Sequence, residues 1–243
     1  MDINKFLTTI DKISSNLDEQ LGNKLVAFYL FGSVMILEDF HPGISDINTF
    51  IVLSNDSGCD EIEKIREIYN KVKHIPLAIP LILKESEIKE SAVVFPIEFL
   101  EISEKNRLVR GKDVLFSLNI SKEHIRRQCE SELRAKIIGL RKMLFGIDDI
   151  SKNLQVLYKS LTSTLILLKQ VLRLKDITVP ETRTAIIDEL ERVFSRKLTG
   201  MKSLYMFREK LEKISKPNIE RLLKNYIEEL EFFSEIINDE KII

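Results

Sequence analysis

The sequence has few residues of the types that form disulfides or hold structural metals. It contains only two cysteines, Cys59 and Cys129, and three histidines scattered along the chain. Because they lack metal-ligand spacing, we expect no disulfide framework and no structural zinc, with a reducing cytoplasm as the default location. The apolar runs are as short as strands or are interrupted by Lys and Arg, so no membrane span is expected. The first five residues lack the pattern of a secretory signal, which also favours a cytoplasmic protein.

The chain also lacks a strong excess of charge. Its 243 residues suit one large or two modest domains, and 44% of them are hydrophobic, as in ordinary globular proteins. Residues 1–120 contain 13 basic and 19 acidic side chains, for a charge of −6. Residues 121–243 contain 24 basic and 19 acidic side chains, for a charge of +5. This mild asymmetry permits a basic surface that faces an anionic ligand but argues against a nucleic-acid partner.

One stretch, residues 25–53, contains most of the chemistry that the sequence suggests. Residues 26–31 form an apolar run of strand length that stops at Gly32 and Ser33. A glycine lets the backbone come close to a bound group, and Ser33 can cap a following helix. The free N–H groups at the start of such a helix suit a phosphate.

A second strand is expected at residues 46–53, after a turn at residues 41–43. Asp46 and Asn48 lie two residues apart on it, so both side chains leave the same face of the sheet. The stretch therefore places a carboxylate and an amide near a candidate phosphate-binding turn.

This arrangement resembles the nucleotidyltransferase superfamily, the fold of polymerase-β-like enzymes and antibiotic adenylyltransferases. The family's signature is an apolar strand, Gly-Ser, about a dozen residues, and two carboxylates that flank an apolar residue. Here Phe31-Gly32-Ser33 is followed by twelve residues and then by Asp46-Ile47-Asn48. The chain departs from the signature at Asn48, where the family has its second carboxylate.

The resemblance implies a site for Mg²⁺ or Mn²⁺ with Asp46, Asn48 and Glu98 as metal-binding and catalytic residues. Asp46 would supply one carboxylate, whereas Asn48 offers only a neutral oxygen, although Mg²⁺ prefers charged ones. Active members carry a third carboxylate on a strand beside the first pair, and Glu98 in the predicted strand 95–102 looks like that residue. Glu101 is a weaker candidate on the opposite face, and an exposed strand-face glutamate is an equal alternative for Glu98.

The first half of the chain alternates between helical and extended patterns, which indicates a mixed sheet with helices. Residues 106–114, with a turn at Gly111, are expected to finish this domain. The apolar run 76–83 contains two prolines, which favour an edge strand or a bulge. Helical patterns cover residues 3–21, 60–72 and 84–91.

The second half is helical throughout. Five helices with short links predict an antiparallel bundle, at residues 121–144, 149–174, 181–197, 201–214 and 218–238. The predicted fold class is therefore α+β, with a nucleotidyltransferase-like domain at 1–118 and an all-α bundle at 119–243. Such bundles follow the catalytic domain in several antibiotic-modifying nucleotidyltransferases. The segments at residues 45–48, 95–102 and 129–144 together also resemble a bacterial group of such proteins without a settled activity.

Three arginines, Arg127, Arg134 and Arg141, recur at intervals of seven residues on the first of these helices. At this spacing they share one side of the helix. A solvated basic face is one interpretation. The other is that Arg134 and Arg141 reach a triphosphate that Gly32 and Ser33 also hold, because guanidinium groups suit phosphate oxygens.

The sequence thus predicts a protein that binds a nucleoside triphosphate and Mg²⁺ between two domains and transfers a nucleotide to a hydroxyl group. The acceptor would be a small molecule or a protein side chain, and a homodimer is left open. The alternative is a catalytically inactive module on the same fold, which senses nucleotides or binds a partner as an antitoxin does. Asn48 is the feature that favours this alternative.

Overall fold

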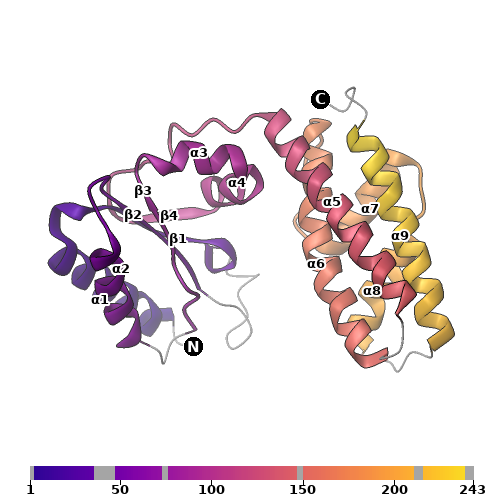
Figure 1. Cartoon of the computed structure of the whole chain (residues 1–243), viewed down its shortest axis with the longest axis horizontal. Helices are drawn as coiled ribbons and strands as arrows, with labels where there is room; N and C mark the ends of the chain where they lie inside the picture. Colours follow the sequence, from indigo (N-terminus) through magenta and orange to yellow (C-terminus); the bar gives the residue numbers. More distant parts are fainter. Residues whose placement is uncertain (1–2, 36–46, 73–75, 147–149, 211–215, 239–243) are drawn as a thin grey trace. The chain divides into compact units, whose positions relative to one another are not determined.

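The computed structural model describes residues 3–35, 47–72, 76–146, 150–210 and 216–238. The chain divides into two compact units, Met1–Ile120 and Ser121–Ile243. The first contains a β-sheet with helices, and the second contains helices (Figure 1). The predicted α+β fold class is confirmed.

The first unit is built on a four-stranded sheet in the order β3-β2-β1-β4. Its strands are β1 (Leu25–Phe31), β2 (Asn48–Leu53), β3 (Leu81–Lys84) and β4 (Asn106–Gly111). β1 pairs antiparallel with both β2 and β4, whereas β2 and β3 are parallel, so the sheet is mixed. β3 is an edge strand, as its neighbouring prolines predict.

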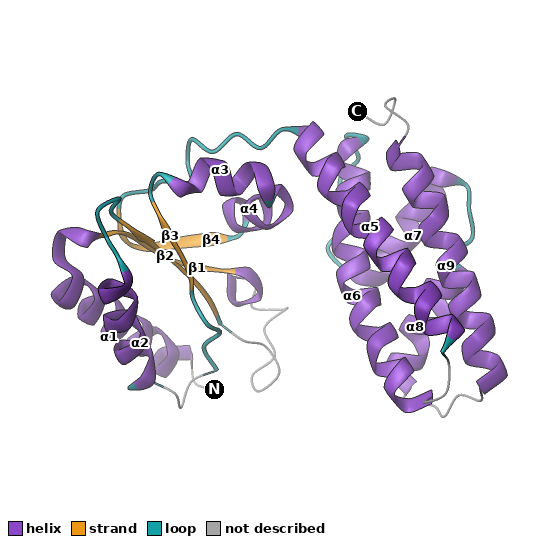
Figure 2. Ribbon diagram, in the orientation of Figure 1, coloured by secondary structure: helices purple, strands orange, loops and turns teal. Residues whose placement is uncertain are grey.

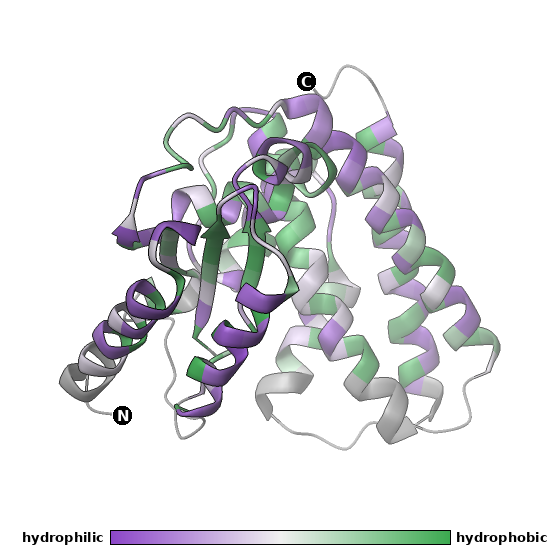
Figure 3. Ribbon diagram, turned by 60° about the vertical axis from the view of Figure 1, so that its left-hand side comes forward, coloured by the Kyte–Doolittle hydropathy of each residue, from purple (hydrophilic) through white to green (hydrophobic). Residues whose placement is uncertain are grey.

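Helices cover both faces of this sheet (Figure 2). Phe28 and Leu30 of β1 pack against α1 (Ile3–Leu21) and α2 (Cys59–Asn70). Ala27 and Tyr29 point the other way, toward the side of α3 (Glu87–Val94) and α4 (Pro96–Glu104). Because both faces are buried, β1 and β2 are apolar along almost their whole length (Figure 3). Each large side chain buried here contributes roughly 1.5–3 kcal/mol.

The strand predicted at residues 95–102 is wrong, because this segment forms helix α4. Pro96 occupies the first turn, where its missing N–H costs nothing. Pro96, Phe99 and Ile102 are buried at intervals of three residues, which is the spacing of one helix face. The extended pairing next to β1 is made instead by β4, in the segment expected only to turn and finish the domain.

The second unit contains five helices within the described residues, and the predicted helices are confirmed. They are α5 (Lys122–Phe145), α6 (Ile150–Leu174), α7 (Arg183–Phe194), α8 (Thr199–Lys210) and α9 (Lys216–Asn238). Helix α5 packs against α6 and α9, and α8 packs against α9. The core includes the fully buried Leu133, Leu168 and Leu230. Among the described residues, no helix is both long and apolar enough to cross a membrane.

Candidate functional site

The candidate site begins at Gly32, directly after β1. Gly32 has φ +82°, in the left-handed region that favours glycine. Its N–H donates to the carbonyl oxygen of Lys105 at 3.2 Å, which ties the end of β1 to the start of β4. Residues Gly32–Met35 form a single 3-10 turn. The expected break in the strand at Gly32 is therefore present, with a short turn at the position of the predicted helix start.

Asn48 lies directly against this glycine. In the antiparallel pairing of β1 with β2, Asn48 is the partner of Phe31, so the start of one strand meets the end of the other. A Cβ atom added to Gly32 would lie only 2.9 Å from Nδ2 of Asn48. The backbone and the amide can approach this closely only because residue 32 has no side chain. The structure thus brings together two of the predicted site residues.

The Asn48 amide is half-buried and makes no hydrogen bond to any residue that the structure describes. It lies two residues before Phe50, so both side chains point to the face covered by α3 and α4. Asp46 and the side chain of Ser33 lie outside the described part of the structure. An amide at this place can donate to or accept from a bound group.

Glu98 comes from a different kind of element from the one expected. It is exposed on α4, and this helix packs onto the sheet face to which Asn48 points. Phe99 makes the contact, with its ring 6.3 Å from that of Phe50 in an edge-on arrangement. Glu101, the weaker candidate, is half-buried on the same helix. Among the described residues, no three His, Cys, Asp or Glu side chains are grouped to hold a metal ion.

No protein-family model matches the chain, and no curated protein matches it at a significant level. Among solved structures, it is similar to a spectinomycin adenyltransferase, AAD(9), from Enterococcus faecialis, crystallised with ATP and spectinomycin. The TM-score is 0.54 at 17% sequence identity, over 94% of this chain and 99% of that one. The chain has a nucleotidyltransferase-like fold. At this identity the likeness establishes the fold and not the activity.

Strand β4 pairs with β1 on the side opposite to β2. It carries polar residues that the sequence analysis did not identify as candidates. Asn106 is paired with Phe31, and its amide donates to the carbonyl oxygens of Ile102 and Ser103 at 2.9 and 3.0 Å. Asn106 therefore caps the end of α4. Arg107 is exposed and pairs with Leu30, two residues before Gly32.

Arg134 and Arg141 lie together in the second unit, in a hollow of about 370 Å³ between α5 and α9. Each has an acidic partner: Nε of Arg134 lies 3.2 Å from Glu130, and Nη2 of Arg141 lies 2.7 Å from Glu231. All three arginines of the predicted stripe are exposed, and Arg127 pairs with Glu123 in the same way. Exposed pairs of this kind contribute roughly 0–1 kcal/mol, so they would not prevent an arginine from binding an anion.

Proposed function

We propose that this protein is a nucleotidyltransferase-like protein that binds a nucleoside triphosphate at the Gly32 turn and transfers its nucleotide to a hydroxyl acceptor. One observation carries the proposal: Gly32 has a positive φ and lies against the amide of Asn48, which makes no hydrogen bond to a residue that the structure describes. This arrangement occurs in a nucleotidyltransferase-like fold, at the end of a buried strand.

In the proposed site, the role of Gly32 is to lack a side chain, and its N–H does not bind the ligand. Its own N–H is used by the Lys105 carbonyl, so a phosphate would meet the N–H groups of the turn that follows. A side chain at position 32 would be forced into Asn48. In the proposal, the Asn48 amide donates to the same ligand, and the acceptor is a small molecule or a protein side chain.

The proposed metal is Mg²⁺ or Mn²⁺, held by Asp46, Asn48 and Glu98. The described residues do not by themselves fit this ion, because Asn48 is neutral and Glu98 stands on a helix, with no acidic group of three. This part of the proposal therefore rests on the sequence motif. Bound near the triphosphate, such an ion would neutralise charge that develops during transfer.

A second function is favoured by the same asparagine. Replacing a carboxylate by an amide removes a full negative charge, and this should cost several kcal/mol of transition-state stabilisation, or roughly a thousandfold or more in rate. The alternative is accordingly a catalytically inactive protein that senses a nucleotide or binds a partner, as an antitoxin does.

The test separates binding from transfer. Binding is measured as thermal stabilisation by each NTP with Mg²⁺ or Mn²⁺, since a ligand at a hundred times its Kd adds about 2.7 kcal/mol. Transfer is measured with α-labelled NTPs and protein, RNA and small hydroxyl acceptors. If saturating millimolar NTP and metal leave the thermal transition unchanged, nucleotide binding is excluded, and nucleotide transfer with it.

The chain offers a matched pair of variants for the binding test. Gly32→Ala and Gly22→Ala each place an alanine at a positive φ, but only at position 32 does the new Cβ meet another side chain. We expect Gly32→Ala to abolish stabilisation by NTP and Gly22→Ala to retain it. Equal loss in both variants would assign the effect to backbone strain and count against a site at Gly32.

A further inference from the structure

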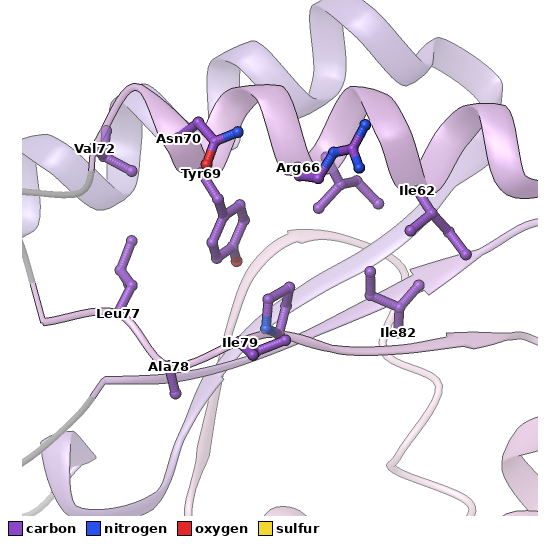
Figure 4. Close-up of a pocket in the computed structure, with 11 residues that line it drawn as sticks. Ile62, Arg66, Tyr69, Asn70, Val72, Leu77, Ala78, Ile79 and Ile82 are labelled. Atoms are coloured by element: carbon purple, nitrogen blue, oxygen red, sulfur yellow. The ribbon is translucent and has the colours of Figure 1, made fainter.

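A second candidate binding site lies in the first unit, between α2 and residues 77–82 at the β3 edge of the sheet. It is a pocket of about 460 Å³, a size within the usual range for small-molecule sites. Figure 4 shows the side chains of α2 pointing toward the neighbouring extended segment. Val72 and Leu77 face each other at one end, and Ile62 and Ile82 face each other at the other.

At the floor of this pocket, the described hydroxyl groups of Tyr69 and Thr49 bind each other. The hydroxyl of Tyr69 is 2.7 Å from Oγ1 of Thr49, which is buried in β2. Burial raises the pKa of the Tyr69 hydroxyl, which therefore stays neutral. Since the two hydroxyl groups satisfy each other, the inner part of the pocket is suited to hydrocarbon rather than to a polar ligand.

Large apolar side chains at the mouth of the pocket are exposed to solvent. Ile79 is 95% exposed, and Ile62 on the opposite wall is 46% exposed. Exposed apolar side chains beside a hollow that is lined mostly by apolar residues suit a binding site for an apolar group. A ligand that covered both side chains would gain from their desolvation.

Two polar side chains stand beside the mouth. In Figure 4, Arg66 and Asn70 lie along α2 and do not point down to the extended segment as Tyr69 does. Nη2 of Arg66 is 3.6 Å from Glu63, and both side chains are about two-thirds exposed, at 69% and 67%. Such a long, exposed pair holds a guanidinium only weakly. Arg66 can therefore turn to an anion at the pocket mouth.

We propose that this pocket binds a medium-chain aliphatic carboxylate, with its hydrocarbon chain between α2 and residues 77–82 and its carboxylate on Arg66. The elongated apolar interior selects an alkyl chain, and the single guanidinium selects one planar anionic group, to which it can donate two hydrogen bonds. The Asn70 amide is a further donor at the same edge. The site is separate from the Gly32 turn and does not depend on nucleotide binding.

The experiment follows isoleucine methyl groups by NMR in the full chain during titration with hexanoate, octanoate or 1-octanol. We expect saturable shifts at Ile62, Ile79 and Ile82 and none at Ile187, which is buried in the second unit. Each added methylene should tighten binding by about fourfold, the value of one buried CH₂. Octanoate should bind more tightly than 1-octanol, because only octanoate pairs with Arg66.

Variants on α2 test the role of charge. Arg66→Gln should weaken octanoate by about fivefold to tenfold and leave 1-octanol within about twofold. Lys64→Gln, a matched loss of one positive charge at an exposed position outside the lining, should change neither. Glu63→Gln should tighten octanoate by about twofold to fivefold, because it releases Arg66.

Three results would overturn the proposal. Absence of saturable shifts would show that the pocket binds no such chain. Equal affinities of octanoate and 1-octanol, or equal effects of Arg66→Gln and Lys64→Gln, would remove Arg66 from the site. Shifts at the same methyl groups that grow with protein concentration alone would show that a second copy of the chain covers the pocket.

Discussion

The two units treat their polar groups differently. In the bundle, polar side chains such as Arg126 form hydrogen bonds that join neighbouring helices or satisfy helix ends. Arg126 donates to Glu123, to Glu130 and to the carbonyl oxygen of Ile237 near the end of α9. In the sheet unit, by contrast, the Asn48 amide lies half-buried at a strand end beside a glycine and has no hydrogen bond to a described residue.

The difference shows where a ligand could gain most. A buried polar group that already has good partners stabilises the fold, and a ligand would have to break those bonds to use it. An amide without such partners among the described residues can donate to or accept from a ligand. The comparison therefore supports the proposal that a ligand binds at the Asn48 amide rather than at the polar groups of the bundle. The following predictions test this difference in the sheet unit and in the bundle.

The largest effect is expected from Gly111→Ala in the sheet unit. Gly111 has φ +89°, and a Cβ there would overlap the carbonyl oxygen of Val26 on the adjacent strand. Strain and overlap together should lower the free energy of unfolding by about 4 kcal/mol or more, measured by urea denaturation. Gly22→Ala is the control, since it also requires a positive φ but meets no atom within 4 Å. It should cost about 1 kcal/mol. Similar losses in both would mean that the approach of β4 to β1 is not tight.

The next effect concerns Glu229 in the bundle. This carboxylate is 3% exposed and accepts the N–H groups of Gly200 and Met201 at 2.6 and 2.9 Å, at the first turn of α8. Burial raises the pKa of Glu229 to about 7, although these two N–H groups and Arg196 lower it and only Glu191 acts in the same direction as burial.

Because the folded state holds this proton more tightly than the unfolded chain, the free energy of unfolding should fall as pH rises. The fall begins near the unfolded pKa of about 4.5 and ends above about 7, with a size of about 3 kcal/mol. Glu229→Gln should be less stable at pH 5 but should lose this slope between pH 5 and 8. Parallel pH profiles for the two proteins would contradict the raised pKa. Ion pairs such as Glu123 with Arg126 do not interfere, because the lowered pKa of Glu123, about 2, confines their loss to more acid solution.

The sequence predicted the elements whose burial pattern repeats over many residues, such as α1 and α6, and the apolar strands β1 and β2. It failed at residues 95–102, because Ile97 and Phe99 alternate as in a strand while Pro96, Phe99 and Ile102 repeat as in a helix. Only packing against the sheet decides between these patterns. Strand β4 was missed because it is short and polar and pairs with a strand far away in sequence.

For the candidate site, the motif predicted that Gly32 and Asn48 belong together, and the structure places them in contact. It could not predict the register that pairs Phe31 with Asn48, since register depends on pairing between distant segments. The i,i+4 spacing of Glu130 and Arg134 on α5 could have indicated their ion pair, whereas the pair of Arg141 with Glu231 could not be predicted, because Glu231 comes from α9.

A smaller effect on stability is expected from Asn48→Asp, which restores a paired carboxylate two residues after Asp46. Like-charge repulsion should lower the free energy of unfolding by about 1 kcal/mol in metal-free buffer, and Mg²⁺ or Mn²⁺ should recover it. Metal affinity should rise, and nucleotide transfer should rise with it. Adding Glu98→Ala should remove that gain if Glu98 completes the metal site. Metal titration and labelled-NTP turnover of the wild type and both variants measure this. An unchanged metal affinity in Asn48→Asp would exclude a metal site at residues 46 and 48.

The smallest effect on stability is expected from Arg141→Ala in the bundle. This variant tests whether the bundle takes part in NTP binding or only supports the fold. The Arg141–Glu231 pair is exposed, so its loss should change the free energy of unfolding by no more than about 0.5 kcal/mol. If the bundle only supports the fold, NTP binding should be unchanged; if Arg141 contacts a phosphate, binding should weaken by about fivefold or more. Arg127→Ala is the matched control, since that arginine is also exposed and paired but lies outside the hollow that holds Arg134 and Arg141. Weaker NTP binding in Arg141→Ala alone would show that Arg141 takes part in NTP binding. Equal weakening in both would instead point to a general loss of positive charge.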